Sequence, residues 1–141
     1  MTGATSGIGR AVALKLAEDG FYVIVHGRDE ARGKATVEEI ESNGGHGRFV
    51  PADLTSESDM ARLVAAVGAV DVLVNNAGFS WFGPTANLDL ATFDALFASN
   101  VRSTYFLVAA LAPRMVERGT GSIINVGSMA GQIGLAGQRD S

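Results

Sequence analysis

The sequence predicts an α/β domain with a doubly wound parallel sheet and helices on both faces. Short apolar runs rich in β-branched residues recur at residues 22–25, 70–74 and 122–126, and segments with helical spacing separate them. Strands that alternate with helices pair in parallel through right-handed crossovers. A chain of 141 residues has the size of one domain, so residues 1–141 are expected to form a single domain.

The first helix and strand follow from spacing and residue type. Ile8, Val12 and Leu16 fall four residues apart, which is typical of one helix face, and Gly20 supplies a stop. Residues 22–25 are aromatic and β-branched, so they predict a strand buried on both faces.

The middle of the chain repeats this order. Residues 29–42 have the polar composition of a surface helix, and residues 48–50 predict a short, weak strand. Either Ser56 or Thr55 is expected to cap a third helix that runs to about residue 67.

The last elements are strand, helix and strand. Residues 70–74 predict a strong strand, and residues 88–118 a long helix with at most one break and a kink at Pro113. Residues 122–126 predict the third strong strand.

The composition argues against several classes of partner and chemistry for this protein. Hydrophobic residues make up 47% of the chain and charged residues 18%, which favours a packed core. The net charge of −4 argues against a nucleic-acid partner. The absence of cysteine excludes disulfides and thiolate chemistry. His26 and His46 lack further ligands at metal-binding spacing, so no metal site is expected.

The sequence shows neither a membrane span nor a leader segment. Each uninterrupted apolar run is shorter than the roughly 18 residues of a membrane span, and no basic-then-apolar leader opens the chain. We therefore expect no membrane partner and a cytoplasmic location.

A Gly-rich turn, Thr-Gly-Ala-Thr-Ser-Gly-Ile-Gly at residues 2–9, leads into the first helix. Glycines here would let the backbone turn sharply and approach a diphosphate, at a helix N-terminus that favours anions. Because glycine is common in this chain, the turn alone is equally consistent with a flexible start to a helix. Three more turns, at residues 26–29, 52–54 and 75–78, follow predicted strands and belong at the same sheet edge, where open α/β folds bind ligands.

Four segments together resemble the ordered signatures of the classical short-chain dehydrogenases/reductases. They are the turn at residues 2–9, Asn-Asn-Ala-Gly at 75–78, Asn100, and Gly-Ser-Ile-Ile-Asn-Val-Gly-Ser at 121–128. The resemblance implies a Rossmann-type sheet, a nicotinamide dinucleotide, and hydride transfer to or from a small carbonyl or alcohol substrate. It also implies a homo-oligomer, because the long helix resembles one that packs between subunits in this family.

The resemblance implies roles for individual residues. Ser128 would orient the substrate oxygen, although a serine after a strand is more often a turn or cap residue. Asn100 would hold a water that relays protons, or would be a core asparagine bonded to backbone; helical spacing places it on an apolar face. The implied cofactor-binding residues are Gly3, Thr5, Ser6, Gly7, Ile8, Gly9, Arg28, Asp53, Leu54, Asn76, Ala77 and Gly78.

Arg28 bears on the choice of cofactor. Gly27 stands where an acidic side chain would bind the 2′-hydroxyl of NAD, and the Arg28 guanidinium that follows suits a 2′-phosphate. The resemblance therefore favours NADP, with Ser6 as a helper, and leaves NAD possible. The alternative is a surface arginine paired with Asp29 or Glu30. For Asn76 and its neighbour Asn75, a structural role in tying strands together is equally open.

The family's acid/base pair, a Tyr with a Lys four residues later, is not in this sequence. The only tyrosines are Tyr22 and Tyr105 and the only lysines are Lys15 and Lys34; in an ungapped extension the Tyr would fall near residue 141. Only Met1 precedes the glycine turn, where the family has its central first strand, so strands near Val23 and Val72 are expected to have unpaired edges.

These two features predict a fragment of a reductase, inactive by itself. One hypothesis for the start is a Val codon within the first strand that was taken as an initiator. Two other interpretations stay open: a non-catalytic nucleotide-binding or regulatory module, and another Rossmann-like enzyme such as a methyltransferase, which the Asn-Asn-Ala-Gly segment fits poorly.

Overall fold

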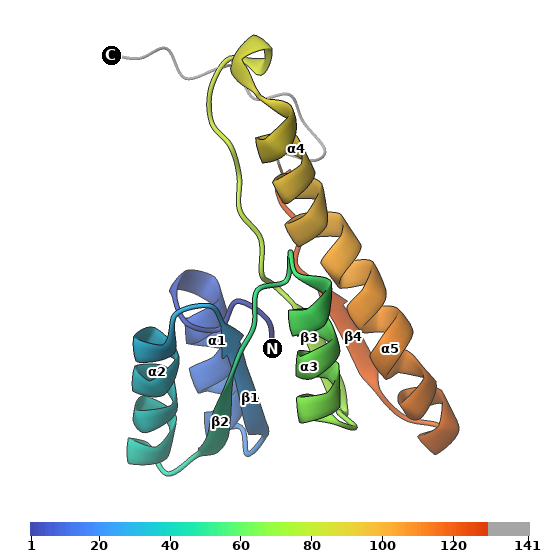
Figure 1. The fold of residues 1–141 in the computed structure, drawn as a ribbon. Helices are drawn as coiled ribbons and strands as arrows, with labels where there is room; N and C mark the ends of the chain where they lie inside the picture. Colours follow the sequence, from blue (N-terminus) through green and yellow to red (C-terminus); the bar gives the residue numbers. More distant parts are fainter. Residues whose placement is uncertain (130–141) are drawn as a thin grey trace.

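The computed structural model of the protein describes residues 1–129 and confirms the alternation of helices and strands (Figure 1). Helix α4 (Leu90–Phe97) continues through a π-helical turn, η2 (Ala98–Arg102), into α5 (Ser103–Arg118). In chain order the elements are α1 (Gly7–Glu18), β1 (Tyr22–Gly27), α2 (Glu30–Ser42), β2 (His46–Pro51), α3 (Glu57–Val67), β3 (Val72–Asn75), the 3₁₀ turn η1 (Thr85–Asn87), α4 (Leu90–Phe97), η2 (Ala98–Arg102), α5 (Ser103–Arg118) and β4 (Ser122–Asn125).

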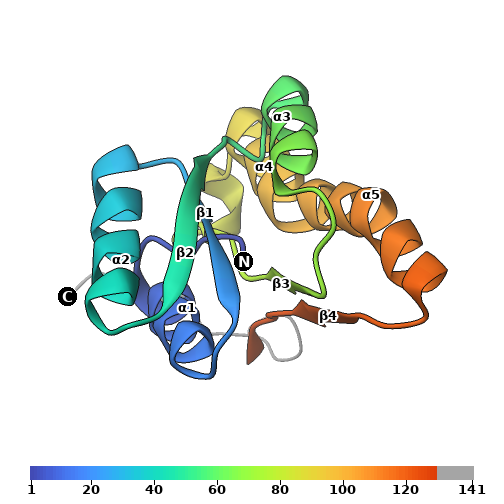
Figure 2. The same cartoon turned by 90° about the horizontal axis from the view of Figure 1, so that it is seen from below.

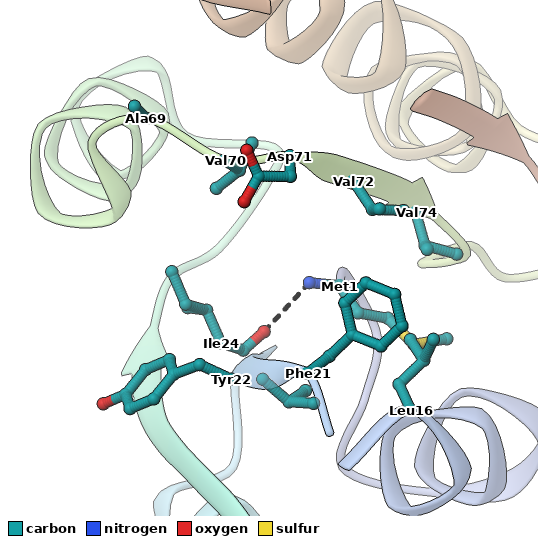
Figure 3. A pocket seen from close by; sticks show the side chains of 11 residues that line it. Met1, Leu16, Phe21, Tyr22, Ile24, Ala69, Val70, Asp71, Val72 and Val74 are labelled. Atoms are coloured by element: carbon teal, nitrogen blue, oxygen red, sulfur yellow. Dashed lines mark hydrogen bonds between the residues drawn. The ribbon is translucent and has the colours of Figure 1, made fainter. Parts of the chain in front are cut away.

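The strands form two separate parallel pairs. Strand β1 pairs with β2, with Val25 opposite Phe49, and β3 pairs with β4, with Leu73 opposite Ile123. Figure 2 shows the two pairs on either side of the chain's N-terminus. Within residues 1–129 the facing edges of β1 and β3 therefore have no strand partner, as predicted, although Met1 and Thr2 lie between them and make backbone hydrogen bonds to Ile24 (Figure 3), His26 and Val74.

Helix α1 forms as predicted but buries a different face. Its buried residues are Gly9, Ala13 and Ala17, whereas Ile8 is 71% exposed. Small side chains on the inner face let the helix lie close to β1, with which it shares a core that includes Val23 and Val25. The apolar stripe through Ile8 is therefore not the buried face, because close packing of this helix needs little side-chain volume on the inner face.

Side-chain caps set the starts of α2 and α3. The Asp29 carboxylate accepts a hydrogen bond from the Arg32 N–H at 2.9 Å, and this backbone bond is the largest cause of the lowered pKa of Asp29. Ser56 accepts from the Asp59 N–H at 3.3 Å, so Ser56 and not Thr55 is the cap of α3.

The long helix differs from its prediction in phase. Its most buried side chains are Ser103, Leu107, Leu111 and Met115, and the last three pack in a core cluster with α3 and β3. The π-helical turn η2 precedes this stretch, and a π turn shifts the helix face that follows it. Of the apolar residues that share helical spacing with Asn100, Phe97 and Val101 are consequently exposed, whereas Val108 packs against the core cluster.

Helix packing also bears on the membrane question. Residues Leu90–Arg118 form one 29-residue helix that is long and apolar enough to cross a membrane by length and composition alone. Uninterrupted apolar runs, on which the sequence-based expectation rested, do not reveal this property. The helix is nevertheless held to the rest of the chain, because Arg102 donates to the Thr55 carbonyl at 2.6 Å and Leu107 and Leu111 lie in the core.

Strand β4 forms where predicted, but all four of its residues are exposed. Helix α5 lies against β3 and β4 on one face, and no helix within residues 1–129 covers the other face (Figure 2). For β1 and β2, by contrast, α1 and α2 lie on one face and α3 on the other, as predicted for a doubly wound sheet.

Candidate cofactor cleft

A cavity of about 400 Å³ lies at the carboxyl ends of β1, β2 and β3. Its walls are the glycine turn and the three turns that follow these strands, as the sequence predicted. Of the predicted cofactor residues, the cavity is lined by Gly3, Thr5, Ser6, Ile8, Gly9, Arg28, Asp53, Leu54, Asn76, Ala77 and Gly78. Gly7 lies beside the cavity in the same turn.

The glycine turn has the geometry of a backbone cradle. Gly7 has φ +53°, a left-handed conformation that favours glycine, and no atom would meet a Cβ added there within 4 Å. Gly9 is the opposite case, because a Cβ there would lie 2.0 Å from the Gly3 carbonyl oxygen. One glycine leaves the helix N-terminus open to an anion, and the other lets the helix pack onto the turn.

Ser6 is the N-cap residue of α1 but makes no side-chain capping bond. A capping serine normally accepts from the second or third N–H of its helix. Here the exposed Ser6 side chain lines the cavity beside the amides of the first helical turn. Both are therefore placed to bond an anion.

Thr2, for which the sequence predicted no separate role, connects the glycine turn to the turn after β3. Its buried hydroxyl oxygen accepts hydrogen bonds from the N–H groups of Asn76 and Ala77, each at 3.0 Å. The same hydroxyl lies 3.4 Å from the Val74 carbonyl, to which it donates. The sequence feature that could have predicted this role is a hydroxyl residue directly before the first glycine of the turn.

His26 is a second residue that sequence reasoning left without a role. Its ring is 3% exposed, and Nε2 lies 3.1 Å from the Ala52 carbonyl oxygen while Nδ1 accepts from the Gly3 N–H at 3.4 Å. This pattern assigns the proton to Nε2. Burial lowers the pKa of His26 to about 4, so the neutral ring ties the glycine turn to the turn after β2.

Arg28 is exposed and lines the cavity. Asp29 pairs with Arg32 at 2.9 Å, and Glu30 pairs with Lys34 at 3.4 Å. The alternative in which Arg28 pairs with one of these carboxylates is therefore wrong. Within residues 1–129 the Arg28 guanidinium has no ion-pair partner, so the cavity has a cation available for an anionic ligand.

Asp53 and Leu54 lie in the turn after β2. The Asp53 carboxylate accepts from the N–H and the hydroxyl of Thr55, both at 2.9 Å, and the Asp53 N–H donates to Asp59 at 2.9 Å. These bonds stabilise the turn after β2. Asp53 therefore acts within the turn, and Ser56 caps α3. Among the described residues no cluster of three or more acidic or His side chains is placed to hold a metal ion.

The two asparagines after β3 have clear structural partners. Asn75 donates to the Asn125 side chain at 2.9 Å, which ties β3 to β4. The Asn76 amide donates to the carbonyls of Thr2 and Gly3 at 3.1 and 3.2 Å. Both therefore connect neighbouring segments, and Asn76 in addition lines the cavity.

Asn100 lies in the π-helical turn η2 and is exposed, so its predicted burial was wrong. Its amide nevertheless has backbone partners, because Oδ1 accepts from the Phe79 N–H at 3.1 Å and Nδ2 donates to the Phe79 carbonyl at 2.8 Å. This pair fixes the segment that follows Gly78. Ser128 follows β4 and is exposed, at the sheet edge that carries the cavity but outside its lining.

Comparison with known proteins agrees with this geometry. An uncharacterised oxidoreductase of Thermotoga maritima is 37% identical over 137 residues, which are 96% of this chain and 55% of that protein. A metagenomic short-chain oxidoreductase solved in complex with NADP is 40% identical with a TM-score of 0.91, over 96% of this chain and 63% of that chain. The bulky-bulky ketone specific alcohol dehydrogenase from Comamonas testosteroni is 30% identical with a TM-score of 0.90, over 95% and 55% of the two chains.

The chain spans about half the length of the curated relatives it matches. The profile of the short chain dehydrogenase family matches residues 1–139. With nearly all of its 141 residues inside that match, this chain belongs to the short-chain dehydrogenase/reductase family.

Proposed function

We propose that the protein is an NADP(H)-dependent oxidoreductase that transfers a hydride between the nicotinamide and a small carbonyl or alcohol substrate. The observation that carries the choice of NADP is the Arg28 guanidinium at the cavity wall, which has no ion-pair partner within residues 1–129. A guanidinium binds phosphate through charge-assisted, bidentate hydrogen bonds. The solved relative with bound NADP adds support.

The residues present fit such a dinucleotide. The open backbone at Gly7, the uncapped Ser6 and the start of α1 suit a diphosphate. Arg28 suits a 2′-phosphate, and the Asp53–Leu54 turn and Asn76–Gly78 provide walls for the adenosine. An acidic residue in place of Gly27 would collide with Thr5, because a Cβ there would lie 2.5 Å from Thr5 Cγ2. This steric fact disfavours NAD-type recognition at that position.

When bound, the nicotinamide accepts or supplies the hydride. The chain's own contribution is to position groups around it. We assign Ser128 to bind and orient the substrate oxygen, and Asn100 to hold a proton-relaying water. The Asn100 amide is already held through Phe79, which suits a residue with a fixed orientation. A second copy of the protein is the proposed macromolecular partner, through the exposed apolar face of α4 and α5.

Arg28→Ala is expected to weaken binding of adenosine 2′,5′-bisphosphate about 10- to 150-fold. The substitution removes charge-assisted hydrogen bonds, which contribute about 1.5–3 kcal/mol. Binding of 5′-AMP, which lacks the 2′-phosphate, should change less than about 3-fold. Isothermal titration of the chain with both nucleotides measures the two affinities.

Arg62→Ala is the matched control for this titration, since Arg62 pairs with Asp59 and does not line the cavity. It should leave both affinities unchanged. Equal weakening of both nucleotides by Arg28→Ala would contradict the assignment of the 2′-phosphate to this guanidinium. Preference for S-adenosylmethionine over NADPH and NADH would favour the methyltransferase interpretation.

Hydride transfer can be tested in a chimera that joins residues 1–128 to the matching carboxyl-terminal part of the Comamonas testosteroni enzyme. We expect NADPH oxidation that depends on a bulky ketone, and a loss of about 10²–10³-fold in kcat for Ser128→Ala, as when one donor to a reacting oxygen is removed. A folded chimera that binds NADPH without turnover would favour the non-catalytic module instead.

A further inference from the structure

An open groove runs between helices α3 and α5, which lie side by side (Figure 1). It holds a cavity of about 550 Å³, and its apolar walls include Met60, Val64 and Ala65 of α3 and Phe106, Leu107 and Ala110 of α5. Among the described residues, this α3–α5 groove shares no lining residue with the cofactor cavity. An inference about its ligand therefore does not depend on the proposed function.

The α3–α5 groove has a buried floor and an exposed rim. Met60 and Leu107 are buried and belong to the core cluster that α3 and α5 share. Phe106 is 52% exposed, and its ring makes an edge contact with the Tyr105 ring at 5.4 Å between centroids. Ala110 is also exposed, and its small side chain leaves space between the two helices. An apolar ligand in the groove would remove this surface from water, which favours binding.

The Arg102 guanidinium lines the groove at the end where α3 begins. Its Nη2 donates to the carbonyl of Thr55, the residue directly before the Ser56 cap of α3. Within residues 1–129 its buried Nε has no hydrogen-bond partner, and no carboxylate forms an ion pair with this guanidinium. Buried donors on a charged group are normally bonded to an acceptor. The arrangement therefore favours an anion at this end of the groove.

Glu57 is the other charged residue of the lining, and it opposes an anion. Its side chain is exposed, whereas Arg102 is partly buried, so solvent screens the charge of Glu57 more strongly. The N-terminus of α3 adds a partial positive charge at the same end. Arg102 and the helix end together thus outweigh Glu57, whose removal should strengthen the preference for an anion.

The length of the groove limits the size of the ligand. Residues 57–65 of α3 and residues 102–110 beside them each span about 12 Å along the helix axis, at about 1.5 Å per residue. An extended hydrocarbon chain of about ten carbons has a similar length, since its C–C bonds are about 1.5 Å long. The cavity volume also lies within the range of roughly 300–1,000 Å³ that is typical of small-molecule sites.

We propose that the α3–α5 groove binds an amphipathic carboxylate, with the carboxylate on the Arg102 guanidinium and an unbranched apolar chain between α3 and α5.

Decanoate is the probe for the first test, and decyltrimethylammonium carries the same apolar chain with a cationic head. Isothermal titration of the chain, with each probe kept below its micelle concentration, measures the two affinities. We expect decanoate to bind at least about 10-fold more tightly, because the head group meets a guanidinium without an ion pair. Equal affinities, or tighter binding of the cationic probe, would overturn the proposal.

Variants of the two charged residues should shift the decanoate affinity in opposite directions. Arg102→Gln keeps an N–H donor for the Thr55 carbonyl but loses the charge, so we expect binding about 10- to 150-fold weaker. Arg102→Lys, which keeps the charge, should recover most of this loss. Glu57→Gln should tighten binding about 2- to 5-fold. Arg62→Gln is the matched control, since Arg62 does not line the groove, and it should change nothing. Shifts of the same sign at Arg102 and Glu57 would contradict the assigned head-group site.

A second test keeps all charges and fills the groove. Ala110→Phe places a ring between α3 and α5, and we expect it to weaken decanoate binding at least about 20-fold. Ala109→Phe is the matched control, because Ala109 is exposed on the same helix outside the lining. Equal affinities of these two variants would overturn the proposal. Decanoate binding that weakens as the protein concentration rises would also overturn it, because a second copy of the chain would then cover the groove.

Discussion

Replacing Gly9 with alanine is expected to lower the free energy of unfolding by about 3 kcal/mol, although alanine is the better helix former by about 1 kcal/mol. The added Cβ would lie 2.0 Å from the Gly3 carbonyl oxygen and 2.4 Å from Asn76 Nδ2. The first contact is with backbone, which cannot rotate away. The second removes the space for the bonds from Asn76 to Thr2 and Gly3. Urea unfolding of the purified chain measures the loss.

Gly127→Ala is the matched control, because among the described residues no atom lies within 4 Å of a Cβ added at Gly127, and its φ is not positive. We expect a change of less than about 0.5 kcal/mol there. A Gly9→Ala chain as stable as the Gly127→Ala chain would mean that α1 can move away from the glycine turn. The backbone cradle at this turn would then not be a rigid feature.

The second large effect concerns pH. As the pH falls from 6.5 toward 4, we expect the free energy of unfolding to fall by about 3 kcal/mol through His26 alone. Burial lowers the pKa of this ring to about 4 in the folded chain, against an ordinary value of 6.5. Between these two values the unfolded chain binds a proton that the folded chain excludes, so folding is favoured as the pH rises.

Urea unfolding at a series of pH values, with wild type, His26→Gln and His46→Gln, isolates this contribution. Glutamine does not titrate, so the part of the slope that His26→Gln removes and His46→Gln retains belongs to His26. Besides burial, three groups act on the ring: the Ala52 carbonyl raises its pKa, the Met1 ammonium lowers it and Asp53 raises it. A His26 pKa of 6 or higher, from an NMR titration of the folded chain, would refute the assignment of a buried neutral ring.

Most of the site could be located from the order of segments in the sequence. Turns that follow parallel strands meet at one edge of the sheet, so the glycine turn, Asp53 and Asn76 could be grouped before any coordinates. Arg28 could be placed at that edge, but its lack of an ion pair could not be predicted. Arg28 lacks an ion pair because Asp29 and Glu30 pair instead with Arg32 and Lys34, one helical turn further along α2.

The buried faces of α1 and of the long helix both differ from the apolar stripes in the sequence, and for the same reason. Periodicity reports which residues share a helix face, but it does not say how close a helix lies to its neighbour or where a π-helical turn shifts the face. Helix α1 therefore turns Gly9 and Ala13 inward in place of Ile8, and α5 buries Leu107 and Leu111 while Asn100 stays exposed.

By itself the sequence determined the order of helices and strands, a cap of α3 at Ser56 or Thr55, and the glycine turn. Local backbone preference and the spacing of apolar residues are enough for these features. The unpaired edges of β1 and β3 were expected from the family resemblance, and the choice of Ser56 as the cap came from the structure. Only the tertiary structure decided the connections made by Thr2 and His26, which join segments 74 and 26 residues apart. Sheet register brings such groups together, and register is a property of the packed chain rather than of either segment.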